Sequence, residues 1–412
     1  MKKYSILLIG IFFFNLSFGQ DTLSSGLVRA HSRSFVISDN NITGNGWTLI
    51  QDAFRSSQFV LLGESHFSPL ISQLTKAILD FMPEDGFNHF MIETGPVAVL
   101  QLMSLYNANS AQFQSNLFNF LSEYKLTNGF PPSEFINMKA DVDMYKKAIE
   151  RNIKIVGLDR EYYSSIEYLF DRLASLTHND RDKKLSQYAK EALLRHKSAY
   201  INDGSYAFMT EVSNDQNIKE YLSVMVETGN EANFIIQELS KTFKVYTMYE
   251  AKKYFDSEEV RLANIKSNFG ISYNSYFLKE KKPMKAFIKI GNVHSGRGLS
   301  PLGHYDIGNT VAELSMMNGN ASTHIYAMRR YRYGDNGEVQ DFIKNGFEKY
   351  EDFIGLSDKE KWIVVDLRPL REAMESRKLV VPVMEERNLI KNHDLLLLLP
   401  VDGAYSESLN YQ

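Results

Sequence analysis

Four short segments of the sequence combine glycine or proline with ionisable side chains, and each follows a run of apolar residues. They are Gly63-Glu64-Ser65-His66, Glu93-Thr94-Gly95-Pro96, Asp159-Arg160-Glu161 and the stretch 291–298, which contains His294 and Arg297. Imidazole and carboxylate groups exchange protons near neutral pH, and a guanidinium group can stabilise negative charge while keeping its own proton. Together these residue types can support general acid–base chemistry.

Taken singly, each of these residues has an ordinary structural explanation. A glutamate such as Glu64 often sits near a helix N-terminus, and a lone histidine is more often hydrogen-bonded than catalytic. Two glutamates, an aspartate and two histidines at four strand ends form the pattern expected of an active site. Because ligands bind outside the carboxyl ends of parallel strands, we expect Glu64, His66, Glu93 and His294 to share one cleft, with Asp159 nearby and Arg297 at its rim.

The elements that must position these residues follow from hydrophobic patterning. Runs rich in Val, Ile, Leu and Phe predict strands at 59–62, 89–92, 153–158, 285–290, 324–328, 362–366 and 395–399. Most are almost continuously apolar, which is typical of strands covered on both faces of a parallel sheet. Apolar residues recur at helical spacing between the first two strands, at 70–81, which predicts a βαβ unit. The predicted fold class is therefore α/β, a mainly parallel sheet flanked by helices.

A helical insertion is predicted at about 164–255, where the strand signal disappears and helical spacing takes over. The insertion starts directly after the Asp159 segment, so we expect it to cover the site and set substrate choice. Tyr162 and Tyr163 are candidate substrate-binding residues beside Asp159, and Tyr168 is a further aromatic side chain expected to be exposed.

Composition excludes several classes of function. The 412 residues include no cysteine, which excludes disulfides, thiolate metal sites and a cysteine nucleophile. There are 46 Lys and Arg against 50 Asp and Glu, and no basic block, so nucleic acid is not an expected partner. Phosphate-binding loops and the Gly-x-Ser-x-Gly elbow of serine hydrolases are also missing from the sequence.

The first 19 residues have the pattern of a cleaved secretory signal. Lys2 and Lys3 precede the apolar run 6–14, and the small residues Ser17 and Gly19 follow it. The run is too short to span a bilayer. We therefore expect residues 1–19 to be removed, leaving 20–412 as a single domain that is exported to the periplasm or the medium and has no membrane partner.

The sequence resembles the erythromycin esterase and ChaN-like superfamily. The segments that carry the resemblance are Phe59-Val-Leu-Leu-Gly-Glu-Ser-His66, Met91-Ile-Glu-Thr-Gly-Pro96, Ile155-Val-Gly-Leu-Asp159, Arg261-Leu-Ala-Asn264 and the stretch 291–298. They occur in this order over most of the chain.

Similarity to the esterases implies a hydrolase, here with a secretory signal, that acts on an ester, lactone or amide of a small molecule or peptide. His66 would be the general base on water, Glu64 and Glu93 its orienting carboxylates, and His294 the second histidine. Arg261 and Arg297 would stabilise a developing oxyanion. No cofactor is required by this reading.

The resemblance has departures that keep alternatives open. The first motif is Glu-x-His, with only Ser65 between the two residues, and Phe67 stands where a glycine usually follows the histidine. This spacing is closer to the haem-binding ChaN-like branch and to related metal-dependent peptidases. A divalent ion would be held by Glu64, His66, Glu93 and His294. Under the haem or tetrapyrrole alternative, the 23 Tyr, 15 Met and nine His would supply stacking surface and axial ligands. A degenerate member that binds a sugar or peptide without turnover is a further possibility.

Overall fold

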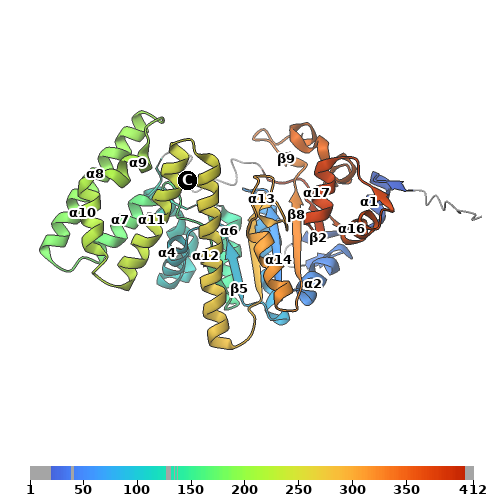
Figure 1. Ribbon diagram of the computed structural model, residues 1–412, viewed down its shortest axis with the longest axis horizontal. Helices are drawn as coiled ribbons and strands as arrows, with labels where there is room; N and C mark the ends of the chain where they lie inside the picture. Colours follow the sequence, from blue (N-terminus) through green and yellow to red (C-terminus); the bar gives the residue numbers. More distant parts are fainter. Residues whose placement is uncertain (1–19, 39–40, 127–130, 134, 137, 404–412) are drawn as a thin grey trace, which may run out of the picture.

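A nine-stranded sheet forms the centre of the computed structural model, which describes residues 20–38, 41–126, 131–133, 135–136 and 138–403. The predicted signal, 1–19, lies outside the described residues. The strand order is β3-β2-β11-β13-β8-β4-β7-β5-β6 (Figure 1). The strands of this sheet are β2 (Ser32–Ser38), β3 (Asn41–Thr43), β4 (Phe59–Glu64), β5 (His89–Ile92), β6 (Lys154–Gly157), β7 (Ala286–Gly291), β8 (Ser322–Met328), β11 (Trp362–Asp366) and β13 (Leu395–Leu398).

The sheet is mostly parallel but includes antiparallel pairings. The neighbours β13, β8, β4, β7, β5 and β6 run parallel, whereas β11 is antiparallel to both β13 and β2, and β2 is antiparallel to β3. Two short pairings lie outside it, β1 (Asp21–Thr22) with β12 (Leu379–Val380) and β9 (Tyr331–Tyr333) with β10 (Val339–Asp341). The parallel strands of the sheet include all those whose ends were predicted to carry the active-site residues.

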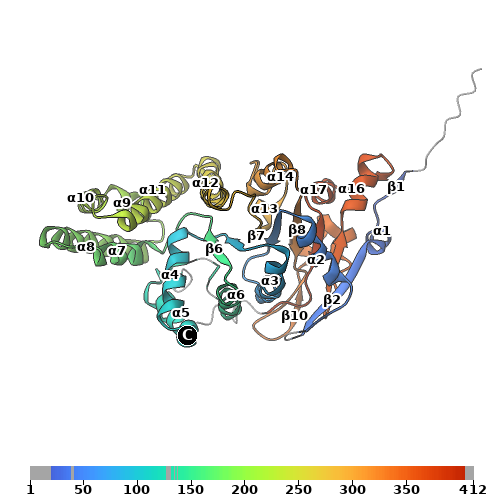
Figure 2. The ribbon, with the colours of Figure 1, turned by 90° about the horizontal axis from the view of Figure 1, so that it is seen from below.

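Both faces of the sheet are covered, as its apolar strands predict. In β4, Val60 and Leu62 pack into one hydrophobic cluster, and Phe59 and Leu61 pack into another on the opposite face. Figure 2 shows α3 and α6 on one side of the sheet and α12 and α14 on the other. The helices that cover or flank the sheet are α1 (Ser25–Ala30), α2 (Gly46–Ser56), α3 (Pro69–Phe81), α4 (Pro96–Ala108), α5 (Phe113–Glu123), α6 (Lys139–Glu150), α12 (Tyr254–Glu280), α13 (Asn292–Ser295), α14 (Ile307–Met317), α15 (Glu351–Ile354), α16 (Arg368–Glu375) and α17 (Met384–Asn392).

Helix α3 fixes the turn that carries Glu64 and His66. Ser68 caps the helix by accepting a hydrogen bond from the Ile71 amide at 3.2 Å, and Pro69 occupies the first turn. Its apolar face is buried in the cluster that contains Val60 and Leu62. The turn is therefore held between a buried strand and a capped helix.

The helical insertion extends from the β6 edge of the sheet (Figure 2). It consists of α7 (Ile166–Ser175), α8 (Asp180–Asn202), α9 (Phe208–Asn214), α10 (Gln216–Met225) and α11 (Asn230–Glu250). The predicted boundary at about 255 falls in the first turn of α12, which continues to Glu280 and packs on the sheet through Leu262, Ile265 and Phe269. Tyr168, expected to be exposed, is buried in the core because it lies on the inner face of α7. Among the helices of the described residues, none is long and apolar enough to cross a membrane.

Candidate active site

Four adjacent strands, β4, β7, β5 and β6, end beside one another at the carboxyl edge of the sheet. Glu64 is the last residue of β4 and pairs in register with Gly291, the last residue of β7. Glu93 follows β5 directly, and Asp159 comes two residues after β6. The parallel register therefore brings Glu64, Glu93 and Asp159 to one edge, together with the segments that carry His66 and His294.

Glu64 holds His66 on one side and a buried lysine on the other. Its Oε1 lies 3.3 Å from His66 Nδ1, and its Oε2 lies 2.6 Å from Lys289 Nζ. Burial would raise the pKa of Glu64, but Lys289 and His66 outweigh burial and lower this pKa to about 2. Glu64 is therefore ionised at neutral pH. Lys289 was missed by sequence reasoning, although a lysine inside the apolar run 285–290 was a usable signal.

Glu93 lies between the two histidines. Its Oε2 is 4.0 Å from His66 Nε2, and its Oε1 is 3.6 Å from His294 Nε2. The Gly291 amide donates to Oε2 at 2.6 Å, and Arg261 Nη2 donates to Oε1 at 2.5 Å. A Cβ at position 291 would lie 3.0 Å from His66 Nε2, so glycine is what allows the strand end and the imidazole to approach this closely.

His294 forms a second carboxylate–imidazole pair with Asp306, the N-cap residue of α14. The distance from His294 Nδ1 to Asp306 Oδ2 is 2.5 Å. Burial lowers the pKa of both histidines, but the carboxylates around each imidazole outweigh burial and raise both pKa values above the ordinary 6.5. The side chain of His66 is 34% exposed and that of His294 only 3%. Two similar pairs thus flank Glu93, and His66 is the more accessible member.

Arg261, from α12, binds the acidic residues of the site together. Its Nε and Nη2 donate to Asp159, at distances down to 2.6 Å, and Nη2 also donates to Glu93. Its Nη1 has only long contacts, 3.4 Å to Glu258 Oε1 and 3.4 Å to His294 Nε2. Burial would raise the pKa of Asp159, but the adjacent arginines hold it well below its usual range. The structure places Arg261, a residue named by the resemblance, beside His294, whereas Asp306 and Glu258 were not foreseen.

Arg297 is not part of this group, which corrects the expectation that it lies at the rim of the cleft. Its guanidinium is paired with Asp394 at 2.9 and 2.5 Å and donates to the Ser322 carbonyl at 3.2 Å. Ser322 begins β8 and Asp394 immediately precedes β13, so these partners lie at the amino ends of their strands. The segment after His294 directs the Arg297 side chain away from the carboxyl edge.

His66 lies against two phenylalanines with unusual backbone conformations. Its ring stacks on Phe135 with 4.2 Å between ring centroids. Phe67 and Phe135 have φ values of 58° and 59°, in the left-handed region that favours glycine. Such a conformation costs about 1–2 kcal/mol in a non-glycine residue. The missing glycine after the histidine of the first motif is therefore a real departure, in which Phe67 keeps a glycine-type backbone and adds an aromatic ring beside His66.

Tyr162 and Tyr163 line a cavity of about 560 Å³ that also includes Arg160 and Arg261. Both tyrosines are half-buried, and the Tyr163 hydroxyl donates to Glu250 at 2.8 Å. The cavity adjoins the histidine site through Arg261. The predicted insertion therefore contributes to a hollow beside the site.

The residues proposed as metal ligands do not fit a divalent ion. The carboxylate of Glu64 is bound to Lys289, and that of Glu93 is bound to Arg261 and to the Gly291 amide. A metal ion would have to displace these cations and donors from the ligand atoms. Within the described part of the chain, no three His, Asp or Glu side chains are arranged to hold a metal ion.

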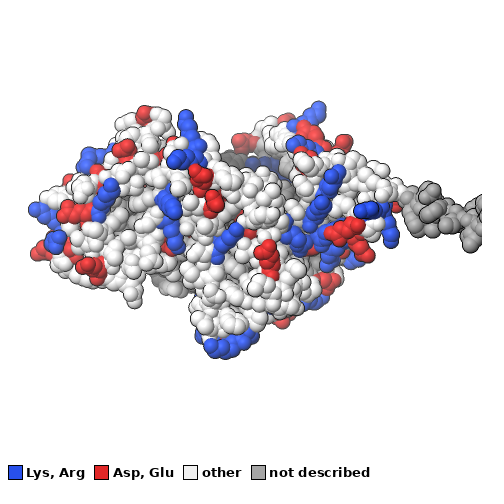
Figure 3. Space-filling view, in the orientation of Figure 1, with Lys and Arg blue, Asp and Glu red and all other residues white. Residues whose placement is uncertain are grey.

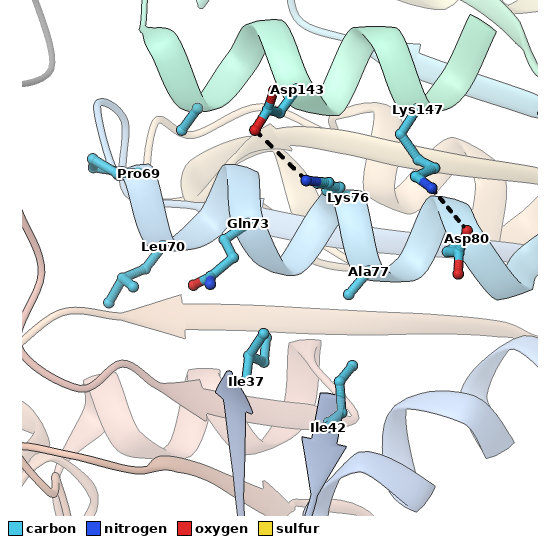
Figure 4. Close-up of a pocket in the computed structure, with 11 residues that line it drawn as sticks. Ile37, Ile42, Pro69, Leu70, Gln73, Lys76, Ala77, Asp80, Asp143 and Lys147 are labelled. Carbon is cyan, nitrogen blue, oxygen red and sulfur yellow. Dashed lines mark hydrogen bonds and ion pairs between the residues drawn. The ribbon is translucent and has the colours of Figure 1, made fainter. Parts of the chain in front are cut away.

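A larger depression, of about 770 Å³, lies between α3, α6 and the β2–β3 hairpin (Figure 4). Its charged residues are paired across the two helices, Lys76 with Asp143 at 3.6 Å and Lys147 with Asp80 at 3.1 Å. It shares no residue with the histidine site. On the face shown in Figure 3, basic and acidic side chains are interspersed without a patch of one sign. Neither feature offers a competing centre for acid–base chemistry.

Comparisons with known proteins support the fold at low sequence identity. No family model matches the chain, and no curated protein matches it. A histidine-to-asparagine mutant of the erythromycin esterase EreC, in its open conformation, is 14% identical with a TM-score of 0.53, covering 90% of this chain and 98% of that one. A Bacillus cereus protein is 14% identical with a TM-score of 0.51, over 92% of this chain and 97% of its own. A succinoglycan biosynthesis protein is 13% identical with a TM-score of 0.53, over 92% and 96%. The chain therefore has an erythromycin esterase-like fold.

Proposed function

We propose that the protein is a hydrolase that uses His66 to activate water against an ester, lactone or amide of a small molecule or peptide. The observation that carries this proposal is the pair of carboxylate–imidazole units around Glu93, of which His66 is the one open to solvent. The likeness of the fold to an esterase is consistent with it.

The proton transfer follows from the contacts of His66. Ionised Glu64 accepts from Nδ1–H, which leaves the Nε2 lone pair free to take a proton from water. Glu93, 4.0 Å from Nε2, stabilises the imidazolium that results. The water oxygen then bonds to the carbonyl carbon, and the proton on Nε2 passes to the leaving oxygen or nitrogen as the bond to carbon breaks.

Arg261 is the best-placed group for the negative charge on the carbonyl oxygen. Its Nη2 is bound to Glu93 and Asp159, whereas the two contacts of Nη1 among the described residues are both 3.4 Å long, so Nη1 can donate to a stronger acceptor. We assign no such role to Arg297, because its guanidinium is bound at the other end of the strands.

The proposed reaction uses no metal ion or haem, because His66 itself takes the proton and the carboxylates of Glu64 and Glu93 are bound to Lys289 and Arg261. We also propose export, with residues 1–19 removed. The intact mass of the mature protein checks this second proposal, and a product that retains 1–14 would contradict it.

The test is a hydrolysis screen of the mature protein with aryl and alkyl esters, lactones and peptide amides, with and without a chelator. His66→Asn should lower the rate by about 10² to 10⁴, the usual contribution of positioned proton transfer. His178→Asn, at an exposed histidine in the turn between α7 and α8, is the matched control and should keep full activity.

Three outcomes would contradict the proposal. Activity that survives His66→Asn would remove the general base. Activity lost to chelator and restored by one divalent ion would favour a metallopeptidase. A tight one-to-one hemin complex without turnover would favour the tetrapyrrole binder.

A further inference from the structure

The cavity beside Arg261 has a lining dominated by tyrosine. It lies among the segment after β6, the turn between α8 and α9, and the corner between α11 and α12. Seven of its lining residues are tyrosines, among them Tyr163, Tyr246, Tyr249 and Tyr254. A volume of about 560 Å³ is within the range of small-molecule sites.

The tyrosine rings are arranged edge to face. Tyr163 and Tyr246 have centroids 5.0 Å apart at 85°, and Tyr249 and Tyr254 have centroids 5.1 Å apart at 66°. Tyr249 and Tyr254 are 56% and 55% exposed, so the core does not require them. The Tyr246 ring is buried and has the Arg160 guanidinium over it at 4.8 Å, whereas the exposed Tyr249–Tyr254 pair leaves ring surface open to a further aromatic ring.

Three of the five charged residues that line the cavity have close partners within the protein. Glu250 accepts from the Tyr163 hydroxyl and from the Met209 and Thr210 amides, at 2.8 to 2.9 Å. Arg160 and Arg261 are both paired with Asp159. A cationic ligand would meet these arginines, and an anionic ligand would meet Glu250. The other two, Lys252 and Glu258, carry opposite charges and so favour neither sign of ligand, and the cavity therefore favours an uncharged ligand.

Arg261 connects the cavity to the acid–base site. It lines the cavity and also contacts Glu93 and His294. A ligand whose ring occupies the cavity would have its other end on the Arg261 side, toward the group we assign to the oxyanion. We propose that this cavity binds the aromatic ring of an uncharged aryl ester or aryl amide; the substrate class rests on the proposed hydrolase function, whereas the binding of the ring does not.

The test uses 2-naphthol as the probe, titrated into the His66→Asn protein by calorimetry. The double variant Tyr249→Ala/Tyr254→Ala, in that background, should raise the Kd by about tenfold, since each aromatic pair contributes a factor of a few. Tyr188→Ala is the matched control, because Tyr188 is an exposed tyrosine on α8 outside the cavity. It should leave the Kd unchanged. In the active protein, the same double substitution should raise KM for 2-naphthyl acetate and leave KM for ethyl acetate unaltered.

Each outcome decides between the inference and its competitors. Absence of saturable 2-naphthol binding, an unchanged Kd in the double variant, or equal competition by cyclohexanol would overturn the aromatic site. Naphthol binding that weakens as expected, in a protein without any hydrolysis, would keep the cavity assignment and remove the proposed enzymatic function. If hydrolysis depended on His66 but the tyrosine substitutions changed neither Kd nor KM, the enzymatic function would stand and the cavity assignment would fail.

Discussion

Two clusters of histidine, aspartate or glutamate, and arginine lie in this protein, and they use similar residue types for different purposes. The edge cluster consists of Glu64, His66, Glu93, Asp159, Arg261, His294 and Asp306. The inner cluster consists of Ser295, Arg297, His324, Arg371, His393 and Asp394. The pKa values of the edge histidines are raised, whereas burial and Arg297 lower those of His324 and His393 to about 3.

The difference follows from what each imidazole contacts. In the edge cluster each histidine has a carboxylate on Nδ1 and lies near Glu93 on Nε2. In the inner cluster Asp394 is bound by two arginines, and the His324 ring lies between the Ser295 carbonyl and the Ser322 hydroxyl. An imidazolium is therefore favoured at the edge and disfavoured inside. Residue types alone do not distinguish a chemical site from a structural one.

Replacing a histidine of the inner cluster should lower the stability of the protein and leave the rate of hydrolysis nearly unchanged. His324→Ala leaves a cavity at a fully buried position and removes the partner of the Ser295 carbonyl. We expect the free energy of unfolding to fall by about 2–4 kcal/mol, measured by urea denaturation. Hydrolysis by the folded protein should change by less than about tenfold, because the reacting groups lie elsewhere. A loss comparable to that of His66→Asn would erase the distinction between the clusters.

Arg297 offers a milder test of the same distinction. Arg297→Met removes one of the two arginines that bind Asp394, while Arg371 remains at 2.6 Å. Because its side chain is 26% exposed and Asp394 keeps a partner, we expect a loss of about 1–2 kcal/mol of stability. If hydrolysis fell a hundredfold with stability unchanged, the oxyanion role implied by the resemblance would be restored.

Replacing Lys289 would change the pKa of His66 while keeping both histidines of the edge cluster. Its charge lowers the pKa of both Glu64 and His66, so Lys289→Met should raise both. A general base works only when it is unprotonated, so the acidic limb of the kcat/KM profile should move to higher pH. The rate should fall at pH 6 and change little at pH 9, and thermal unfolding serves as the control for folding. An unshifted acidic limb would show that the limb does not report His66.

Much of the central sheet could be predicted from the sequence because its strands are apolar on both faces. The run 59–62 is buried on both sides, and so its composition alone identifies β4. β2 was missed because its apolar run is only three residues long, Phe35-Val36-Ile37, between polar residues, and Phe35 alone is buried. The antiparallel direction of β11 depends on chain connections that its five residues do not encode.

The site was predictable where it follows strand ends and unpredictable where it depends on the folded path. Glu64, Glu93 and Asp159 lie at the edge because parallel register dictates it. Asp306 contacts His294 because the loop between the two residues folds back toward His294. The Arg297 side chain lies outside the site because it is paired with Asp394. The spacing of these residues along the sequence predicts neither contact.

The most direct test of the central claim is an NMR titration of the histidine ring protons, with signals assigned by single His→Asn variants. We predict that His66 and His294 titrate above the ordinary value of 6.5 and that His324 and His393 remain neutral as the pH is lowered toward 4. This needs no knowledge of the substrate. If His66 titrated at or below 6.5, or if His324 titrated together with it, the contacts of the edge cluster would not set its histidines apart from those of the inner cluster, and the central claim would fail.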